Sequence, residues 1–199
     1  MLLLPSAFIP YCHYFSLIVQ KECAIYVGEM YQKQSYRNRT DLLSPNGVVS
    51  FSLPVQKIGY PSPDTSGVLL SPHGNWRHQL EKLLLSNYAN TPYWFHYEER
   101  IMKLIYDESV EELVLYNHKW LTFICDSLEI SAPSIVYEMG DTDTFIPEII
   151  TAEYKNNLPT PKRYWQVFEH KFGFTPHLSI LDLLLSLGPE ARPYLRHSL

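Results

Sequence analysis

Residues 1–27 read MLLLPSAFIPYCHYFSLIVQKECAIYV and contain the pattern that decides the fold. The apolar run at residues 2–4 is typical of a short buried strand, which ends at Pro5. Pro10 opens a helix of about ten residues, since proline is well tolerated in the first helical turn. A second apolar run follows at residues 23–27. Strand, helix and strand in this order predict a βαβ unit with parallel strands.

The next segments predict a β-hairpin and the position of a binding rim. Residues 39–43 and 48–55 flank the turn Ser44-Pro45-Asn46-Gly47, and Asn-Gly supplies the positive φ that a tight hairpin needs. Ligands of parallel α/β units gather beyond the carboxyl ends of the strands, which here means residues 6–8 and 28–30. The fold class is therefore predicted as α/β, with a small mixed sheet that has a βαβ start and a β-hairpin.

The C-terminal part is predicted to be mainly helical. Most helix starts carry a recognisable signal, either a Thr-Pro pair or a capping box. These starts are Trp76, Thr91-Pro92, Ser109-x-x-Glu112, Thr160-Pro161, Ser179-x-x-Asp182 and Pro189. In the helix after Thr160-Pro161, the aromatic residues Tyr164, Trp165, Phe168 and Phe172 are predicted to face inward, with Gly173 as the stop. Between the helices, residues 59–67 and 140–147 are predicted to be loops, and residues 68–70 and 134–139 strands.

Length and composition predict one globular domain, residues 1–199. The chain has 199 residues, enough to bury a substantial core. An α/β half at about residues 1–71 and a mainly helical half at about 72–199 are expected to share that core, since no long linker separates them. Mean hydropathy is −0.15, which is typical of a soluble protein. The net charge of −5 gives no indication of nucleic-acid binding, and no apolar run is long enough to span a membrane.

The cluster Tyr36-Arg37-Asn38-Arg39 is the strongest candidate for chemistry. Arginine presents a planar fork of donors that fits carboxylate or phosphate. On a strand, alternate side chains share a face, so Arg37 and Arg39 are expected to point at one anion. The alternative is that both arginines pair with acidic residues at the surface and protect a strand edge from aggregation.

His73-Gly74-Asn75-Trp76 lies at a predicted strand-to-helix junction. His73 is a candidate general base, because its unperturbed pKa lies near neutrality, and the start of a helix favours an anion. The alternative is a helix-capping segment, with Asn75 as the cap and Trp76 as a core anchor. The aromatic block that begins at Tyr93 similarly suits either stacking on a sugar or base, or packing in the core.

Well-known catalytic patterns are absent from the chain. It has no phosphate loop, no G-x-G-x-x-G, no H-E-x-x-H and no G-x-S-x-G. No two histidines have a convincing metal-binding spacing, so no metal site is predicted and the cofactor is left unknown. Three scattered cysteines favour reduced thiols in the cytosol over a disulfide framework.

An ordered set of short motifs resembles the WbqC-like protein family over nearly the whole chain. The set comprises Leu4-Pro5-Ser6, Ile9-Pro10, Tyr14-Phe15, Tyr36-Arg37-Asn38-Arg39, Pro45-Asn46-Gly47, Leu53-Pro54-Val55, His73-Gly74-Asn75-Trp76, Thr91-Pro92-Tyr93, Tyr164-x-Gln166-Val167-Phe168, Leu178-Ser179-Ile180-x-Asp182-Leu183-Leu184 and Gly188-Pro189-Glu190. The chain departs from many relatives at Leu4-Pro5-Ser6, where they have His-x-Pro, and only Glu29 supplies an acid after the second strand. The resemblance implies a bacterial, cytoplasmic protein of a largely uncharacterised family, some members of which lie in surface-polysaccharide (O-antigen) gene clusters.

Two hypotheses follow from the residues and the resemblance together. The first is a transferase, of aminoacyl or acyl type, which moves an amino acid such as glycine to an amino sugar and binds an anionic or nucleotide-linked small molecule. Its catalytic candidate is His73. Its candidate substrate-binding residues are Tyr14, Tyr36, Arg37, Asn38, Arg39, Asn46, Trp76 and Tyr93. The second hypothesis is a non-enzymatic binding or assembly protein with an aromatic surface. The sequence leaves the oligomeric state open.

Overall fold

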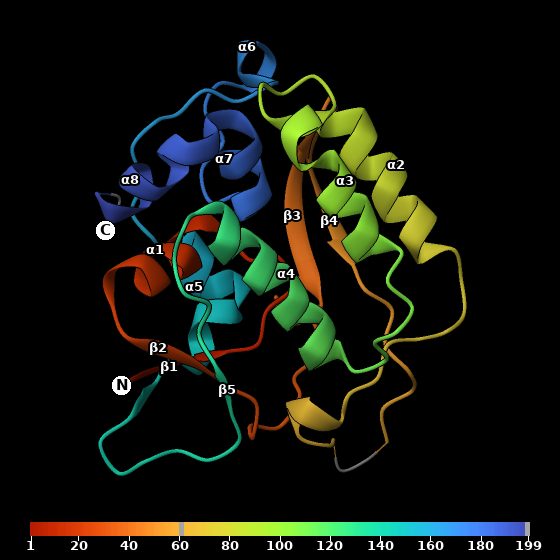
Figure 1. The fold of residues 1–199 in the computed structure, drawn as a ribbon, viewed down its shortest axis with the longest axis vertical. Helices are drawn as coiled ribbons and strands as arrows, with labels where there is room; N and C mark the ends of the chain where they lie inside the picture. The colour runs from red at the N-terminus through yellow and green to blue at the C-terminus, as the bar shows by residue number, and fades with distance from the viewer. Residues whose placement is uncertain (60–61, 198–199) are drawn as a thin grey trace.

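The computed structural model of the protein describes residues 1–59 and 62–197 (Figure 1). Its larger sheet is parallel and has the strand order β5-β2-β1-β6. β1 (Leu2–Pro5) and β2 (Cys23–Tyr26) pair in parallel along their full length, with α1 (Cys12–Gln20) between them in the chain. The predicted βαβ unit and the α/β class are therefore confirmed.

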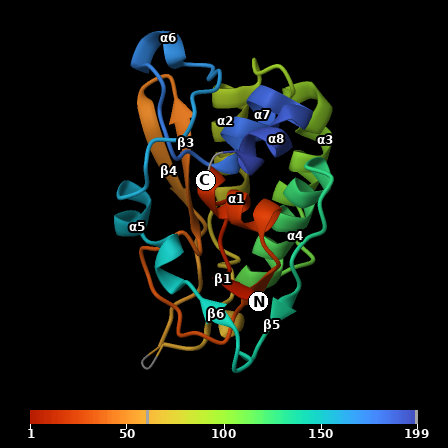
Figure 2. The ribbon, with the colours of Figure 1, turned by 90° about the vertical axis from the view of Figure 1, so that its left-hand side faces the viewer.

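The predicted hairpin is also confirmed, and it forms a sheet of its own. β3 (Arg39–Ser44) and β4 (Gly47–Ser52) pair antiparallel, with Gly47 at a φ of +103° in the turn. The hairpin packs along α2 (Trp76–Tyr88) (Figure 2). The Tyr88 hydroxyl at the end of α2 accepts a hydrogen bond of 3.0 Å from the Leu43 backbone N–H.

Helices dominate the rest of the described chain (Figure 1). In chain order they are α3 (Trp94–Ile105), α4 (Leu113–Ser127), α5 (Ala152–Asn156), α6 (Glu169–Phe172), α7 (Ile180–Leu187) and α8 (Ala191–Arg196). Short 3-10 turns occur at Thr65–Gly67, Pro147–Ile150 and Gly188–Glu190. The edge strands β5 (Ile135–Val136) and β6 (Thr144–Phe145) have two residues each. In the described residues no helix combines the length and the apolar character that crossing a membrane requires.

The buried apolar side chains form one continuous cluster that draws on both ends of the chain. Phe15 of α1 and Leu184 of α7 are both fully buried, and α1 packs against α7 and α8. The Gln20 side chain at the end of α1 donates to the Leu195 carbonyl in α8 at 2.9 Å. This packing puts the first and last helices of the chain beside each other (Figure 1).

The helix predicted after Thr160-Pro161 is wrong, since only the short α6 is helical there. The Gln166 side chain bonds both backbone groups of Thr175, at 2.8 and 2.9 Å, and so holds the segment in an irregular path. Trp165 and Phe172, predicted to face inward, are 47% and 42% exposed. Tertiary side-chain bonds therefore outweighed the local helical pattern in this segment.

Two predicted helix caps are also wrong. The Thr91 hydroxyl donates to the Tyr88 carbonyl and closes the preceding helix, so that α3 begins only at Trp94. Ser109 bonds the Asp107 carboxylate, and α4 begins at Leu113. In both places the side chain that was predicted to cap the helix forms a hydrogen bond within the preceding turn, because a partner is closer there.

The predictions for the short strands and loops are partly wrong. Residues 68–70 form isolated bridges to neighbouring segments in place of a strand, and residues 134–139 shorten to β5. The predicted loop 140–147 contains β6, which pairs with β1. The predicted loop 59–67 contains a 3-10 turn, and its residues 60–61 lie outside the described part of the chain.

Candidate functional site

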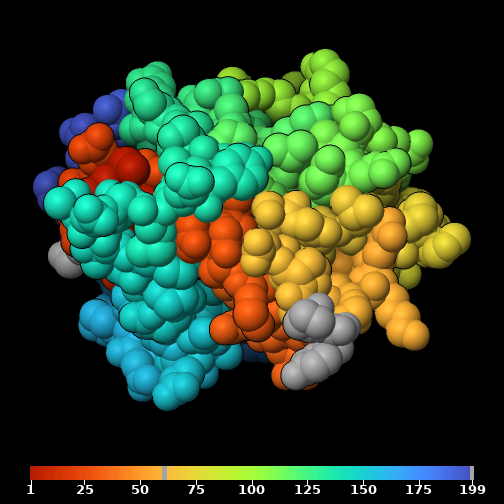
Figure 3. Space-filling model, turned by 90° about the horizontal axis from the view of Figure 1, so that it is seen from below, coloured from red at the N-terminus to blue at the C-terminus, as the bar shows by residue number. Residues whose placement is uncertain are grey.

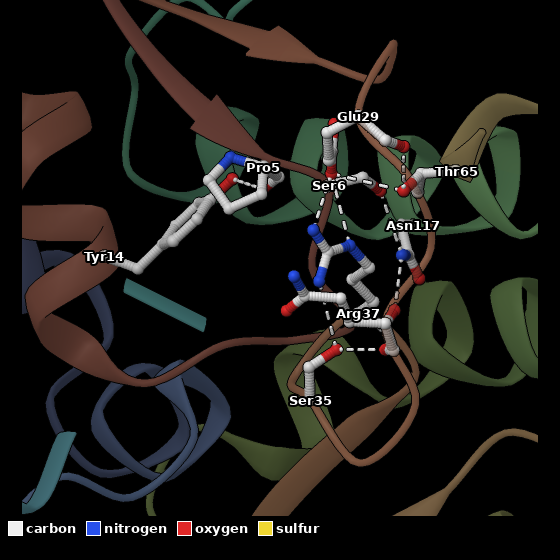
Figure 4. A network of polar contacts seen from close by, with 9 residues as sticks. Pro5, Ser6, Tyr14, Glu29, Ser35, Arg37, Thr65 and Asn117 are labelled. Carbon is white, nitrogen blue, oxygen red and sulfur yellow. Dashed lines mark hydrogen bonds and ion pairs between the residues drawn. The ribbon is translucent and has the colours of Figure 1, made fainter. Parts of the chain in front are cut away.

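A polar network lies at the carboxyl ends of β1 and β2 (Figure 4). Ser6 follows β1 directly, and Glu29 lies three residues beyond the end of β2. Arg37 precedes the hairpin, and Asn117 reaches the network from α4. Both Ser6 and Glu29 lie in the rim segments predicted from the strand ends. We call Ser6, Glu29, Arg37, Thr65 and Asn117 the strand-end network.

An ion pair between Glu29 and Arg37 forms the centre of the strand-end network. Arg37 is 1% exposed and donates from Nε and Nη2 to one carboxylate oxygen, Glu29 Oε1, at 3.1 and 2.9 Å. Its Nη1 donates to Ser35 Oγ at 3.4 Å. Glu29 Oε2 is buried and has no hydrogen-bond partner among the described residues. Arg37 therefore holds one oxygen of the carboxylate, while the other oxygen is buried and unpaired among the described residues.

The buried environment of Glu29 shifts the pKa of its carboxyl. Burial raises the pKa of the carboxyl above its usual value, and the charge and hydrogen bonds of Arg37 offset this only in part. The Thr65 hydroxyl lies 3.0 Å from the Glu29 carbonyl oxygen and 3.2 Å from Oε1, and contributes to the same offset. A carboxyl with a raised pKa and an unpaired oxygen in a buried network is a candidate for proton transfer.

Asn117 connects Arg37 to Ser6. Its Nδ2 donates to the Arg37 carbonyl at 2.8 Å and to Ser6 Oγ at 3.0 Å. Beside it lies a cavity of about 10 Å³, also lined by Tyr14 and His118. Asn117 Oδ1 and His118 Nδ1 are buried without a hydrogen-bond partner in the described chain. Burial lowers the pKa of His118 and so favours the neutral imidazole. The cavity is thus polar, and about the size of one water molecule.

The residues of the predicted anion-binding cluster, 36–39, lie in different environments. The Tyr36 hydroxyl donates to the Asp41 carboxylate, which also accepts from Ser50 and Lys155. Burial raises the pKa of Asp41, but these three hydrogen bonds outweigh it, so the pKa lies below its usual value. Tyr36 therefore belongs to a cluster around the Asp41 carboxylate, in which Lys155 already supplies the positive charge.

Arg37 and Arg39 do not lie on one strand as predicted, because β3 begins at Arg39. Arg39 pairs with Ser52 in the ladder, and its Nε is buried without a hydrogen-bond partner among the described residues. Asn38 donates from its side chain to the Leu53 carbonyl at 2.8 Å. Neither arginine lines the small cavity beside Asn117.

The other predicted binding residues lie in separate places. Tyr14 is buried and donates to the Pro5 carbonyl at 2.8 Å. Asn46 is in the exposed hairpin turn. Tyr93 packs against Gly188, where a Cβ atom would lie 2.3 Å from its ring. Their substrate-binding roles stay predictions.

His73 and Trp76 line two neighbouring surface cavities. His73 is exposed in a cavity of about 300 Å³ that also contains Lys57. Trp76 is buried and lines a cleft of about 410 Å³. Neither of these two cavities is lined by Arg37 or Arg39. The role of His73 as a general base stays a prediction, and Arg37 belongs to a different, buried environment.

Sequence reasoning missed the roles of Glu29, Thr65 and Asn117. Glu29 carried a usable signal, because it is the acid that follows the second strand of a βαβ unit. Thr65 and Asn117 carried none, since a long loop and α4 bring them to the site. Among the described residues, no group of three or more His, Cys, Asp or Glu side chains is placed to hold a metal ion.

Comparison with known proteins found one matching family model and a full-length relative. A sequence model described as the WbqC-like protein family matches residues 6–144. The chain is 28% identical over 222 aligned residues to "Uncharacterized protein Rv1507c" of Mycobacterium tuberculosis (strain ATCC 25618 / H37Rv), and the alignment covers 96% of this chain and 95% of that protein. No solved structure matches the chain.

Proposed function

The chain belongs to the WbqC-like protein family, and from this membership and the strand-end network we propose that it is an aminoacyl or acyl transferase of bacterial surface-polysaccharide biosynthesis. Its substrates are an activated acyl donor, such as an aminoacyl phosphate, and an amino sugar carried on a nucleotide. The observation that carries the proposal is the buried, unpaired Oε2 of Glu29 beside Arg37. Polar groups left unpaired at the carboxyl ends of parallel strands favour a ligand site there.

In the proposed reaction, the amine of the acceptor attacks the carbonyl carbon of the acyl donor. A C–N bond forms, the bond from the acyl carbon to the phosphate oxygen breaks, and phosphate leaves. Glu29 Oε2 takes the proton that the amine loses, a task for which the raised pKa of this carboxyl is suited. Arg37 is a positioning residue, because its two bonds to Oε1 fix the direction of Oε2.

The test separates substrate binding from proton transfer. Thermal shifts are measured with nucleotide-linked amino sugars and with non-hydrolysable aminoacyl-phosphate analogues, and amide product is detected by mass spectrometry. We expect Glu29→Gln to keep the ligand-induced shifts and to lose about 100-fold or more in turnover. Glu22→Gln, at the exposed residue just before β2, is the matched control and should behave as wild type.

The same assay decides between Glu29 and the sequence-based prediction for His73. His73→Ala lowers turnover if the imidazole is the base, and leaves it unchanged if Glu29 is. Absence of a thermal shift with every ligand, or equal turnover in wild type and Glu29→Gln, would remove the proposal.

The second candidate is a non-enzymatic binding protein, and the exposed aromatic residues Trp165 and Phe172 favour it. Both belong to the segment around α6 and are 47% and 42% exposed. Two large exposed rings in one segment are typical of a contact surface. If binding of an oligosaccharide or protein partner is lost in Trp165→Ala and kept in Glu29→Gln, with no product formed by wild type, this candidate replaces the transferase.

A further inference from the structure

A surface cleft lies between the segment before α2 and the segment before α4. Its volume is about 410 Å³, and its polar lining includes Gln56, Asn75, Arg77, Glu108 and Glu111. The two walls are joined by a backbone hydrogen bond of 2.7 Å from Leu70 N–H to the Glu111 carbonyl. Figure 3 shows these segments side by side, gold and green, on one face of the molecule.

Arg77 provides a fixed positive charge in this cleft. Its guanidinium lies 4.1 Å from the centre of the Trp76 ring, and Nη1 donates to the Ile105 carbonyl at 2.8 Å. No carboxylate of the described residues lies within 4.0 Å of it, whereas Arg37, Arg100, Arg163 and Arg192 each have such a partner. A guanidinium that is held in place by an aromatic face, and has no anion beside it, is prepared for an anionic ligand.

The backbone at the same end of the cleft adds to this preference. α2 begins at Trp76, and the Asn75 side chain makes no capping hydrogen bond. Among the described residues, the first N–H groups of this 13-residue helix therefore have no side-chain acceptor, and they lie in the wall that contains Arg77. Gly74, at a φ of +88°, has open space where a Cβ would project. Arg77 and these N–H groups together suit a phosphate group.

The opposite wall has a different chemistry. Glu108 and Glu111 are exposed, and neither forms a salt bridge within the described residues. Carboxylates accept hydrogen bonds from hydroxyl groups and repel a free phosphate ion. The cleft thus favours a molecule that carries both a phosphate group and hydroxyl groups.

We propose that this cleft is a binding site for a phosphate ester of a polyhydroxylated molecule, that is, a sugar phosphate. The phosphate contacts Arg77 and the start of α2, and the hydroxyl groups donate to Glu108 and Glu111. This site is separate from the strand-end network, and the inference holds whether or not Glu29 is a catalytic base.

Isothermal titration calorimetry with glucose 1-phosphate, glucose and inorganic phosphate tests the proposal. We expect glucose 1-phosphate to bind in a 1:1 ratio and at least 10-fold more tightly than either of the other two probes. Arg77→Gln should weaken binding of glucose 1-phosphate by about 10- to 100-fold. Arg100→Gln is the matched control, because Arg100 also lies over an aromatic ring, Phe123, and its removal should change nothing in this titration.

A second variant guards against loss of folding in Arg77→Gln. Asn75→Asp leaves Arg77 and Trp76 unchanged, keeps an equally good capping residue and adds a negative charge at the start of α2, so its melting temperature should be equal or higher. Its carboxylate nevertheless occupies the phosphate position and should weaken glucose 1-phosphate at least 10-fold. Absence of binding in wild type, unchanged affinity in Asn75→Asp, or inorganic phosphate binding as tightly as glucose 1-phosphate would each overturn the proposal.

Discussion

At the scale of single residues, Glu29 and Arg37 show that the role of a sequence motif depends on the residue it contacts in the fold. Two arginines around an asparagine indicate affinity for an anion. In the folded chain the anion of Arg37 is the chain's own Glu29, at 2.9 Å. Buried ion pairs are weak stabilisers, because desolvation cancels much of the attraction. The pair is therefore better explained by the position it gives to Glu29 Oε2 than by stability.

Asp182 is a second buried carboxyl whose role differs from the prediction. Ser179 does cap α7, accepting from the Leu181 N–H, but Asp182 does not complete a capping box. It is fully buried, and its Oδ2 accepts from the Tyr164 hydroxyl at 2.7 Å and from Gln166 Nε2 at 3.0 Å. Burial raises its pKa to about 6, against the lowering effect of its hydrogen bonds.

This shift gives Asp182 a predictable effect on the pH dependence of stability. In the unfolded chain the Asp182 carboxyl loses its proton near pH 4, whereas in the folded chain it keeps the proton up to about pH 6. The contribution of Asp182 is therefore most favourable below about pH 4 and is lost as the pH rises to about 6. Two pKa units correspond to roughly 3 kcal/mol. The Asp182→Asn variant has no titrating group at this position. Its free energy of unfolding minus that of wild type should therefore increase by on the order of 2–3 kcal/mol between pH 4 and pH 7.

Urea unfolding at several pH values measures this difference. Asp126→Asn, at an exposed aspartate, is the control and should follow wild type throughout. A constant difference between Asp182→Asn and wild type across this range would show that Asp182 does not titrate in the way its burial implies.

At the scale of elements, local signals predicted those elements whose own residues stabilise them. The hairpin follows from Asn46-Gly47, and the βαβ start from two apolar runs with a helix between them. The caps at Thr91 and Ser109 failed because each side chain found another acceptor nearby. Propensity is a weak signal when a competing hydrogen bond is within reach.

The end of α7 offers a test of close packing between elements. Gly188 has a φ of +55°, and a Cβ there would lie 2.3 Å from the Tyr93 ring. Gly188→Ala should therefore cost strain of about 1–3 kcal/mol plus a further cost of about 1–3 kcal/mol for the clash. Chemical denaturation gives the free energy of unfolding.

Gly173→Ala is the matched control, because Gly173 has a φ of +70° but nothing within 4 Å of a new Cβ. It should show the strain without the clash. In a Tyr93→Ala background, the extra cost of Gly188→Ala should disappear. Equal losses in free energy of unfolding for the two glycine variants in the wild-type background would show that the Tyr93 ring moves aside without measurable cost.

At the scale of the whole molecule, the parallel sheet joins the two predicted halves. β1 and β2 come from the first half, but Ile25 pairs with Ile135 in β5 and Leu2 with Thr144 in β6. The hydrophobic cluster likewise contains residues from both halves. The single domain of residues 1–199 stays a prediction, and these shared elements indicate how to test it.

We expect the full chain to unfold in one cooperative transition, and residues 1–71 alone to remain unfolded. The isolated segment lacks both edge strands and the helices α7 and α8 that cover α1. Calorimetry of the full chain should give equal calorimetric and van't Hoff enthalpies. Circular dichroism of the segment should show no cooperative melting. Two separate transitions in the full chain, or a folded segment, would contradict a shared core.

The sequence by itself determined the α/β class, the βαβ start, the hairpin, the rim at the strand ends and the family. Each of these depends on patterns a few residues long, whose physics is local. Only the tertiary structure decided that Glu29 pairs with Arg37, that Asn117 and Thr65 join them, and that Asp182 meets Tyr164 and Gln166. Those partners lie from 8 to 80 residues apart in the chain. The burial that raises the pKa values of Glu29 and Asp182 exists only once the whole core has formed.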